Sequence, residues 1–271
     1  MEDKSMKKYI IMMAFAGLAA SCSQTEEVIP NNDQEIRIEA ALPQNSRATS
    51  TKFETGDKLA LFAVEYQNGN SIPLQVSGNF LINEAMTYNG SEWNATRKLY
   101  WSDAACDFYG IYPYQSLNKV ENVLFEVAAN QNLPETEEAL SSYEASDLMW
   151  AKAENVSREN GVVNLKFNHL MSRLVVKVEK GSRFEGDIPD DIVTHLYNTA
   201  TTAKVNYATG SLEKYVYSEN KTITMRKVDN ETFDAIVVPQ FIERTTPLVE
   251  ITMGGIISKF EVKDACLEAI N

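Results

Sequence analysis

The sequence predicts an all-β protein made of two antiparallel β-sandwich domains with little helix. After residue 33, apolar and polar residues alternate with a period of two in several segments, as they do in strands with one buried face. About a dozen short candidate strands follow one another, many separated by turn residues at roughly the 8–12-residue spacing of β-sandwiches. Because one sandwich holds only about seven to nine strands, we place a boundary near residues 167–173. This gives an N-terminal domain at residues 35–168 and a C-terminal domain at residues 169–271.

Each predicted strand rests on its local pattern. Residues 35–40 (EIRIEA) alternate charged and apolar side chains, which is typical of a half-buried strand. Residues 58–64 (KLALFAV) form a short, largely apolar run, which favours a strand buried on both faces. Residues 248–253 and 256–260 are joined by Gly254-Gly255, which favours a tight hairpin because both central turn residues need a positive φ. Shorter runs predict further strands at residues 79–83, 107–112, 123–127, 148–151, 162–167, 174–178, 204–207, 222–225 and 233–238.

Helix is predicted at few places. Residues 134–140 begin with proline and acidic residues, which favour the first turn of a short helix. Residues 169–173 are predicted to form a single helical turn between strands, and residues 264–270 have helical propensity.

Composition and charge narrow the classes of function. The chain has 271 residues, 44% of them hydrophobic, which is enough for a core and excludes a disordered or collagen-like protein. It carries 25 basic and 38 acidic residues, a net charge of -13. Because such a surface repels phosphate backbones, we expect no nucleic-acid partner.

The first 34 residues have the features of an export and anchoring segment. Lys7-Lys8 precede an apolar run at residues 9–20, too short to span a bilayer comfortably, so residues 1–21 are predicted to be a signal peptide. The end of this run, Leu18-Ala19-Ala20-Ser21-Cys22, resembles the lipobox of exported lipoproteins. Cys22 is therefore predicted to carry the lipid that anchors the chain to a membrane; the alternative is an ordinary signal peptide followed by an unrelated cysteine. Residues 22–34 are predicted to be an acidic tether.

Residues suited to catalysis or metal binding are few. The sequence has two histidines, His169 and His195, and no Cys-x-x-Cys spacing, so we expect neither a zinc site nor another cofactor. Cys106 and Cys266 form either one disulfide or, as we favour, two unrelated thiols. No nucleophile motif or phosphate-binding glycine loop occurs, so the chain is predicted not to be an enzyme.

Aromatic residues suggest an alternative function. Residues 100–101 and 108–112 contain five Tyr, Trp and Phe side chains that could form a sugar-stacking face of a surface glycan-binding lipoprotein. In strands such residues are more often part of the core.

An ordered set of short motifs resembles the fimbrillin family, the subunits of type V fimbriae. After the lipobox and a first strand ahead of Arg47, the motifs are FETGDKLALF at 53–62, WS at 101–102, DFYGIYP at 107–113, DLMWA at 147–151 and LKFNHLMSRL at 165–174. The resemblance covers most of the chain. It implies an exported lipoprotein with two transthyretin-like β-sandwich domains, which reaches the outer membrane as a precursor and then the cell surface or fimbrium.

The resemblance also implies assembly by strand exchange with other fimbrial subunits. In the family, an arginine-specific protease cuts in the loop behind the first strand, that strand leaves, and a neighbour's C-terminal strand takes its place. Here the polar loop at residues 44–50 is predicted to be cut between Arg47 and Ala48. The displaced strand would be residues 35–40, with Ile36, Ile38 and Ala40 on its apolar face.

The C-terminal segment departs from the family pattern. After residue 262 the tail is short and does not alternate, whereas the family usually continues with an extended donor strand. The sequence therefore predicts either a tip or accessory subunit, which accepts a strand without donating one, or an altered tail.

Overall fold

The computed structural model describes residues 34–42, 52–137, 139–217, 222–243, 247–261 and 265–269, all within one folded unit, Asn32–Asn271. These ranges contain twenty strands, β1 to β20, and two turns of 3-10 helix, η1 (Glu144–Ser146) and η2 (Arg158–Asn160). The predicted all-β class, with antiparallel sheets and little helix, is confirmed. In the part of the chain that is described, no helix has the length and apolarity to cross a membrane.

The helical segments predicted from the sequence are wrong where they can be compared. Near residues 134–140 the chain forms a loop closed by Thr136, which exchanges hydrogen bonds with Ala139: its N–H donates to the Ala139 oxygen (2.9 Å) and its Oγ1 accepts from the Ala139 N–H (3.1 Å). Such a side-chain hydrogen bond competes with helix. Residues 169–173 belong largely to strands β9 (Asn168–His169) and β10 (Ser172–Lys177), and residues 265–267 form β20 (Ala265–Leu267). Strand pairing overrides a weak helical propensity at these places.

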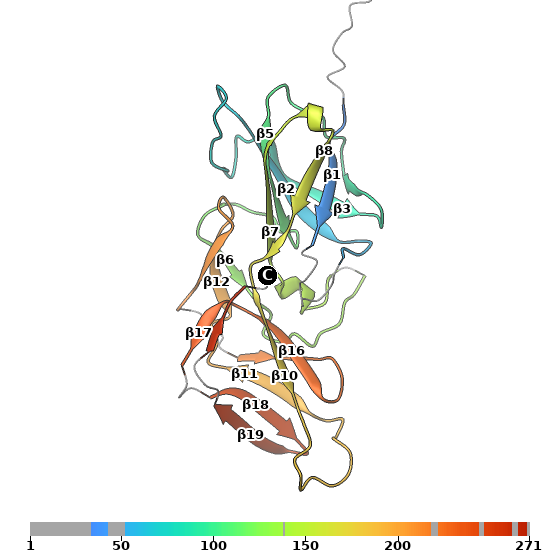
Figure 1. The fold of residues 1–271 in the computed structure, drawn as a ribbon, viewed down its shortest axis with the longest axis vertical. Coiled ribbons are helices and arrows are strands. Elements are labelled where there is room, and N and C mark those ends of the chain that lie inside the picture. The colour runs from blue at the N-terminus through green and yellow to red at the C-terminus, as the bar shows by residue number, and fades with distance from the viewer. Residues whose placement is uncertain are drawn as a thin grey trace, which may run out of the picture. The chain divides into compact units, whose positions relative to one another are not determined.

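The largest sheet has six antiparallel strands in the order β4-β3-β2-β5-β7-β9 (Figure 1). Its central strands, β2 (Lys58–Glu65) and β5 (Cys106–Tyr112), are buried on both faces, as the apolar run at residues 58–64 predicts. The other strands of this sheet, besides β9, are β3 (Leu81–Tyr88), β4 (Trp93–Ala95) and β7 (Met149–Val156).

One face of this sheet is covered by the two-stranded sheet of β1 (Arg37–Ala41) and β8 (Val162–Lys166). The β8 segment approaches β5 so closely that a Cβ placed on Gly110 would lie 2.7 Å from the Phe167 ring and 3.0 Å from a Leu165 methyl carbon. A larger residue at position 110 would force the Phe167 ring and the Leu165 side chain to shift within a close-packed core.

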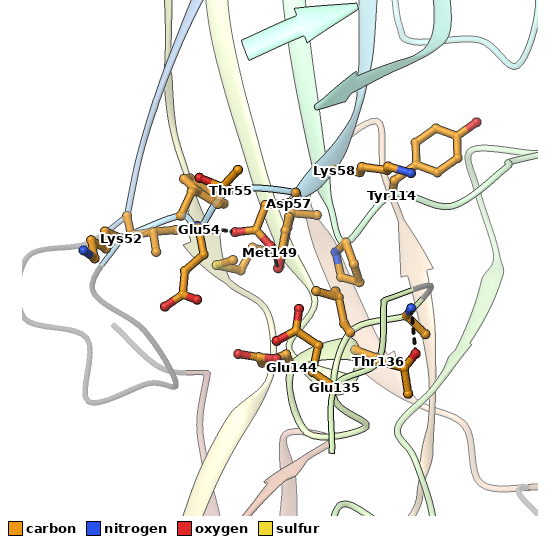
Figure 2. A pocket seen from close by; sticks show the side chains of 18 of the residues that line it. Lys52, Glu54, Thr55, Asp57, Lys58, Tyr114, Glu135, Thr136, Glu144 and Met149 are labelled. Carbon is orange, nitrogen blue, oxygen red and sulfur yellow. Dashed lines mark hydrogen bonds between the residues drawn. The ribbon is translucent and has the colours of Figure 1, made fainter. Parts of the chain in front are cut away.

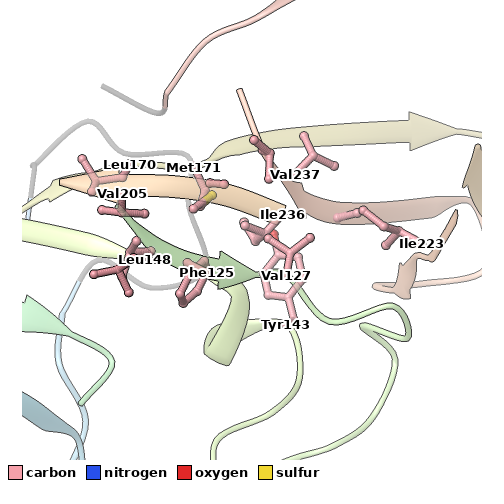
Figure 3. Packing of buried hydrophobic residues seen from close by; sticks show 14 of the residues in the cluster. Phe125, Val127, Tyr143, Leu148, Leu170, Met171, Val205, Ile223, Ile236 and Val237 are labelled. Carbon is pink, nitrogen blue, oxygen red and sulfur yellow. The ribbon is translucent and has the colours of Figure 1, made fainter. Parts of the chain in front are cut away.

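The other face of the six-stranded sheet packs into a second apolar cluster that continues into the C-terminal half of the chain (Figure 3). Trp150 of β7 links the two halves, since its Nε1 donates to the Tyr207 carbonyl (2.8 Å). A Cβ on Gly210 would lie 2.5 Å from the same indole. The cluster includes Ala60, Phe62, Tyr109 and Ile111 from the sheet together with Phe125, Val205, Ile223 and Ile236.

Four smaller sheets are formed mostly by the C-terminal half of the chain, and one of them also takes in β6. Their strand orders are β13-β12-β6, β10-β16-β15, β14-β11-β18-β19 and β17-β20. The strands are β6 (Val123–Glu126), β11 (Val193–Tyr197), β12 (Thr202–Asn206), β13 (Ser211–Lys214), β14 (Thr222–Thr224), β15 (Arg226–Lys227), β16 (Thr232–Val237), β17 (Gln240–Ile242), β18 (Pro247–Met253) and β19 (Ile256–Glu261). Gly254 and Gly255, both at positive φ, join β18 to β19 as the predicted hairpin turn.

Strand pairing crosses the predicted domain boundary. β6, which lies in the predicted N-terminal domain, pairs antiparallel with β12, which lies in the predicted C-terminal domain. The division at residues 168 and 169 stays a prediction, and the segment that contains β6 shares its core with the strands that follow the boundary.

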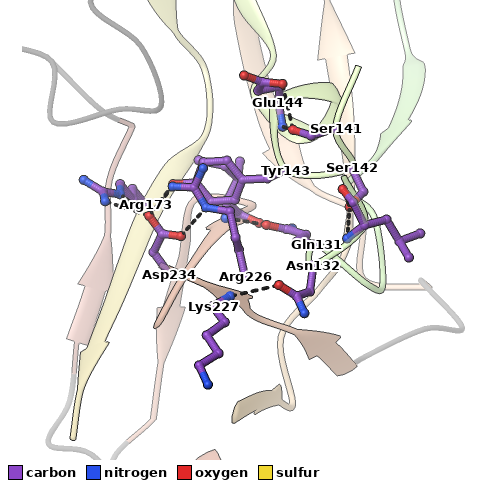
Figure 4. A network of polar contacts seen from close by, with 12 residues as sticks. Gln131, Asn132, Ser141, Ser142, Tyr143, Glu144, Arg173, Arg226, Lys227 and Asp234 are labelled. Atoms are coloured by element: carbon purple, nitrogen blue, oxygen red, sulfur yellow. Dashed lines mark hydrogen bonds and ion pairs between the residues drawn. The ribbon is translucent and has the colours of Figure 1, made fainter. Parts of the chain in front are cut away.

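A buried polar network fastens this crossing segment to β16 (Figure 4). Asp234 is fully buried and accepts hydrogen bonds from the Tyr143 hydroxyl (2.8 Å), from Arg173 and from Arg226. The Arg226 guanidinium also lies 3.6 Å from the centre of the Tyr143 ring. The amide of Gln131 bonds to both backbone groups of Ile236, with both distances at 2.7 Å. These contacts satisfy polar groups that would otherwise be costly to bury.

Cys106 is a free, fully buried thiol at the start of β5. Burial, together with the nearby charges of Glu65 and Asp107, raises the pKa of Cys106 to about 12. Because only the thiolate reacts, we expect Cys106 in the folded chain to be alkylated by iodoacetamide at pH 8 at least about a thousandfold more slowly than an unperturbed thiol. Peptide mapping by mass spectrometry measures this rate, with the chain in guanidinium chloride as the reactive control. Comparable rates in the two states would contradict the expectation.

Candidate functional site at the first strand

The strand predicted to be displaced is present and alternates as its sequence indicates. Ile36 and Ile38 are each only 6% exposed, Ala40 is half-buried, and Arg37 and Glu39 face solvent. The predicted lipidation residue Cys22 and the predicted cleavage residues Arg47 and Ala48 lie outside the described residues. They remain predictions.

β1 is paired along its length on one side only. It runs parallel to β8, with Arg37 opposite Val162 and Ala41 opposite Lys166. On its other side there is a short antiparallel contact near residue 35, where the Ile36 N–H donates to the Leu99 oxygen (2.7 Å) and the Trp101 N–H donates to the Gln34 oxygen (3.1 Å). β1 is thus an edge strand, and its parallel partner is a feature that the sequence does not indicate.

The second half of β1 borders two cavities. One, of about 270 Å³, is lined by Ile38–Ala41 together with Tyr88, Trp93 and Leu165 among others. The other, of about 640 Å³, is lined by Ala40–Leu42 and by residues 52–55, Tyr88 and Gly90. Within the described residues, therefore, no strand pairs with this stretch of the β1 edge.

The side chains beneath β1 form an apolar floor. Ile36 and Ile38 share one cluster with Leu59 and Leu61 of β2, Phe108 of β5, and Val163 and Leu165 of β8. Removing β1 would expose this floor and leave β8 with an unpaired edge. An exposed apolar strip beside an unpaired strand is the surface on which another strand can dock.

The chain is firmly anchored just beyond the predicted cleavage loop. Phe53 is buried, and its ring meets Trp93, Tyr112 and Phe167 edge to face, at centroid distances of 5.0, 5.4 and 5.6 Å. Such aromatic contacts stabilise beyond the area that they bury. Loss of the strand before the loop would therefore leave the chain after it held in place.

A family model described as fimbrillin-like matches residues 46–269. The chain belongs to this fimbrillin-like family. A curated protein described as fimbrium subunit Fim1C, from Phocaeicola vulgatus, is 25% identical over 263 residues. That alignment covers 87% of this chain and 63% of the relative, so the chain spans less than two thirds of the relative's length.

Solved structures support the fold of this fimbrillin-like chain. A candidate cell adhesion protein from Bacteroides ovatus superposes with a TM-score of 0.66 at 16% identity, over 88% of this chain and 89% of the other. A candidate cell adhesion protein from Bacteroides uniformis gives 0.64 at 20% identity, over 87% and 88%. At these identities the likeness shows the fold alone.

The C-terminal end of the described chain is engaged in pairing. β20 pairs antiparallel with β17, with Phe241 opposite Cys266, and the Ser172 hydroxyl donates to the Glu268 carbonyl. The described part of β20 has three residues, and the predicted absence of an extended donor strand stays a prediction.

The aromatic residues of the alternative glycan-binding function do not form a stacking face. Trp101 is 6% exposed, and Phe108, Tyr109 and Tyr112 are buried as well; Tyr100, at 41%, is the exposed member of the set. This burial agrees with the core placement that the sequence favours, and it contradicts the alternative of a shared sugar-stacking surface. These side chains fill the two faces of the six-stranded sheet.

Two polar pairs in the fimbrillin-like motifs were not predicted from the sequence. His169 is buried and its Nδ1 lies 2.9 Å from the Asp147 carboxylate. Asp57, which lines the cavity shown in Figure 2, is also buried, and one of its oxygens accepts a hydrogen bond from the Tyr112 hydroxyl (2.8 Å). The second histidine, His195, has its Nδ1 3.7 Å from the Glu250 carboxylate. Among the residues described, no three His, Cys, Asp or Glu side chains are grouped in a way that could hold a metal ion.

Proposed function

We propose that this chain is a structural or adhesive subunit of a cell-surface fimbria, exported as a lipidated precursor and assembled by protease-triggered donor-strand exchange. The observation that carries the proposal is the position of β1, an edge strand whose Ile36 and Ile38 lie in the core. Membership of the fimbrillin-like family and the fimbrial relative support it.

We expect exchange because the apolar floor beneath β1 must stay covered by one strand or another. Cleavage after Arg47 separates β1 from the chain that begins at Ala48 and is anchored by Phe53, so β1 is then held by noncovalent contacts alone. Its departure costs the burial of Ile36 and Ile38, each worth about 1.5–3 kcal/mol, and the hydrogen bonds to β8. A neighbour's strand restores both the apolar burial and the hydrogen bonds to β8 if its inward residues match those of β1. The first two inward positions then need large apolar residues, and the third, which corresponds to Ala40, needs a small one.

Location and partners follow the same sequence of steps. Lipid on Cys22 would hold the precursor at the outer membrane, and cleavage by an arginine-specific protease between Arg47 and Ala48 would release the rest of the chain from that anchor. The partners before and after cleavage are therefore the membrane and the protease, then other fimbrial subunits at the cell surface.

We place the subunit at a tip or accessory position rather than in the shaft. The strand-forming residues 265–267 are paired with β17, and Ser172 bonds to the backbone at residue 268. A segment occupied within its own subunit is not free to fill a neighbour's groove.

Limited proteolysis tests the maturation step. We expect an arginine-specific protease to convert the purified precursor into one stable fragment that begins at Ala48, as read by N-terminal sequencing. An Arg47→Ala variant should stay uncut at this position, whereas Arg183→Ala, at another exposed arginine, should still give the fragment. Scattered cleavage or complete digestion of the wild-type chain would overturn the proposal.

A further inference from the structure

The hairpin of β18 and β19 gives its sheet an open edge (Figure 1). In the order β14-β11-β18-β19, no strand in the described part of the chain pairs with the outer side of β19. All six residues of β19 are exposed, and three of them are large and apolar: Ile256 (69%), Ile257 (60%) and Phe260 (47%). Soluble proteins usually protect such an edge, because it can pair with a strand of another chain.

The register of the hairpin shows which backbone groups of β19 are free. The two-glycine turn makes Met253 and Ile256 a hydrogen-bonded pair, and bonded pairs then alternate with non-bonded pairs along the two strands. Every second residue of β19, from Ile256 to Phe260, therefore bonds to β18. Ile257 and Lys259 instead direct their N–H and C=O groups to the open edge.

Lys259, in the middle of β19, does not shield this edge. A lysine on an edge strand can prevent pairing with another chain. Here, however, Lys259 Nζ lies 3.4 Å from the Glu250 carboxylate and 5.4 Å from the centre of the Tyr197 ring. These two residues belong to β18 and β11, so the ammonium group lies over the sheet of its own chain and its charge is balanced there. The chain as a whole carries a net charge of -13, but β19 holds one lysine and one glutamate and adds nothing to the repulsion between copies.

The sequence of β19 is complementary to itself. When two copies run antiparallel with their Ser258 residues opposite each other, Ile256 of each copy lies opposite Phe260 of the other. The free backbone groups of Ile257 and Lys259 then face one another, as an antiparallel ladder requires. No like charges are opposed in this register, whereas a register centred on Lys259 would place two ammonium groups face to face.

We infer that β19 pairs antiparallel with β19 of a second copy of this chain, centred on Ser258, and so joins two four-stranded sheets into one. Both copies use the same edge, so the association closes at two copies. A pair of six-residue strands is a small interface, and interfaces below about 1,200 Å² give weak, reversible complexes. The inference does not depend on strand exchange, because these residues lie on neither β1 nor β8.

Sedimentation of the full chain in a density-matched detergent tests the inference. We expect a reversible dimer at high micromolar concentration. Lys259→Pro removes an N–H that faces the open edge rather than β18, so it should abolish the dimer and leave the circular dichroism spectrum unchanged. Lys259→Ala is the matched control: it loses the same side chain but keeps the N–H, so its Kd should stay within about threefold of the wild-type value. Because the variants keep the same N-terminal segment, sharing of a micelle cannot account for a difference between them.

The apolar cross-strand pairs are tested in the same assay. Ile256→Ser with Phe260→Ser changes two exposed residues, so the fold should be kept. The Kd of the dimer should rise about tenfold or more, because both Ile–Phe pairs are lost.

Oxidative cross-linking tests the register. A non-bonded antiparallel pair has its Cα atoms about 4.5 Å apart, within the range of a disulfide. Ser258→Cys should therefore give a disulfide-linked dimer. Ser116→Cys, at an exposed residue elsewhere, should not exceed the background of the wild-type chain, which has cysteines of its own. A wild-type chain that stays monomeric, equal dimerisation of Lys259→Pro and Lys259→Ala, a Kd unaffected by the double serine variant, or cross-linking no greater at position 258 than at position 116 would overturn the inference.

Discussion

Replacing Asp234 by alanine is expected to lower the free energy of unfolding by about 2–4 kcal/mol. The substitution removes the carboxylate that binds Arg226, Arg173 and Tyr143 and leaves two guanidinium groups without it. Breaking a buried ion pair from one side costs about 3–5 kcal/mol. The expected loss is smaller here because the side chains of Arg173 and Arg226 are 24% and 32% exposed. Urea unfolding followed by circular dichroism measures the change.

Two further variants control for the loss of charge and for the loss of one contact. Glu213→Ala breaks a surface ion pair with Lys204, so it should cost no more than about 1 kcal/mol. Tyr143→Phe removes one hydroxyl donor to Asp234 and should cost about 1–2 kcal/mol. The expectation is contradicted by an Asp234→Ala chain as stable as the Glu213→Ala chain.

The hydrogen bonds to Asp234 make the free energy of unfolding depend on pH. Burial alone raises the pKa of Asp234, but the hydrogen bonds from Arg226, Arg173 and Tyr143 outweigh it, so the pKa lies below its ordinary value. A group with a lowered folded-state pKa stabilises the fold above its unfolded pKa of about 3.9, and this stabilisation is lost as the pH falls toward the folded value. The Asp234→Ala chain should therefore lose less stability than the wild-type chain as the pH is lowered below about 4.

The parts of the fold that could be predicted are those determined by the pattern of a few consecutive residues. Residues 35–40 alternate with a period of two, and Ile36 and Ile38 are buried as that alternation requires. The run at residues 58–64 was sufficient to predict burial on both faces, and Gly254-Gly255 was sufficient to predict a hairpin. In each of these cases, the pattern and its structural consequence involve the same few residues.

The parts that could not be predicted depend on residues far apart in the chain. The parallel partner of β1 is β8, with Arg37 opposite Val162, and no local pattern in either strand specifies the other. The buried pairs likewise join Asp57 to Tyr112 and His169 to Asp147, and no local pattern around either residue specifies its partner. The error at residues 265–267 has the same origin, because the pairing that decides their conformation is made by β17.

Removing β1 from the folded chain is expected to lower the free energy of unfolding by at least about 3–6 kcal/mol. Ile36 and Ile38 are both 6% exposed, and burying an isoleucine is worth about 1.5–3 kcal/mol. The lost pairing with β8 adds to this, since β8 is then left with an unpaired edge over an apolar floor. Comparing urea unfolding of residues 48–271 with that of the whole chain measures the difference, and binding of an apolar dye should rise in the shorter chain.

A synthetic peptide with the sequence of residues 34–42 should restore most of this stability when added in trans, because it carries the same inward side chains. Ile36→Ser with Ile38→Ser in the peptide should abolish the effect. Arg37→Ser with Glu39→Ser is the matched control: it also changes two residues, but both face solvent, so this peptide should still restore the chain. If the two altered peptides act equally, alternation along β1 does not decide which strand the groove accepts. If residues 48–271 are as stable as the whole chain, β1 covers nothing that the fold needs. Rescue by the solvent-face variant alone would show that a strand supplied from outside is selected by its inward apolar residues, which is the physical requirement for exchange between subunits.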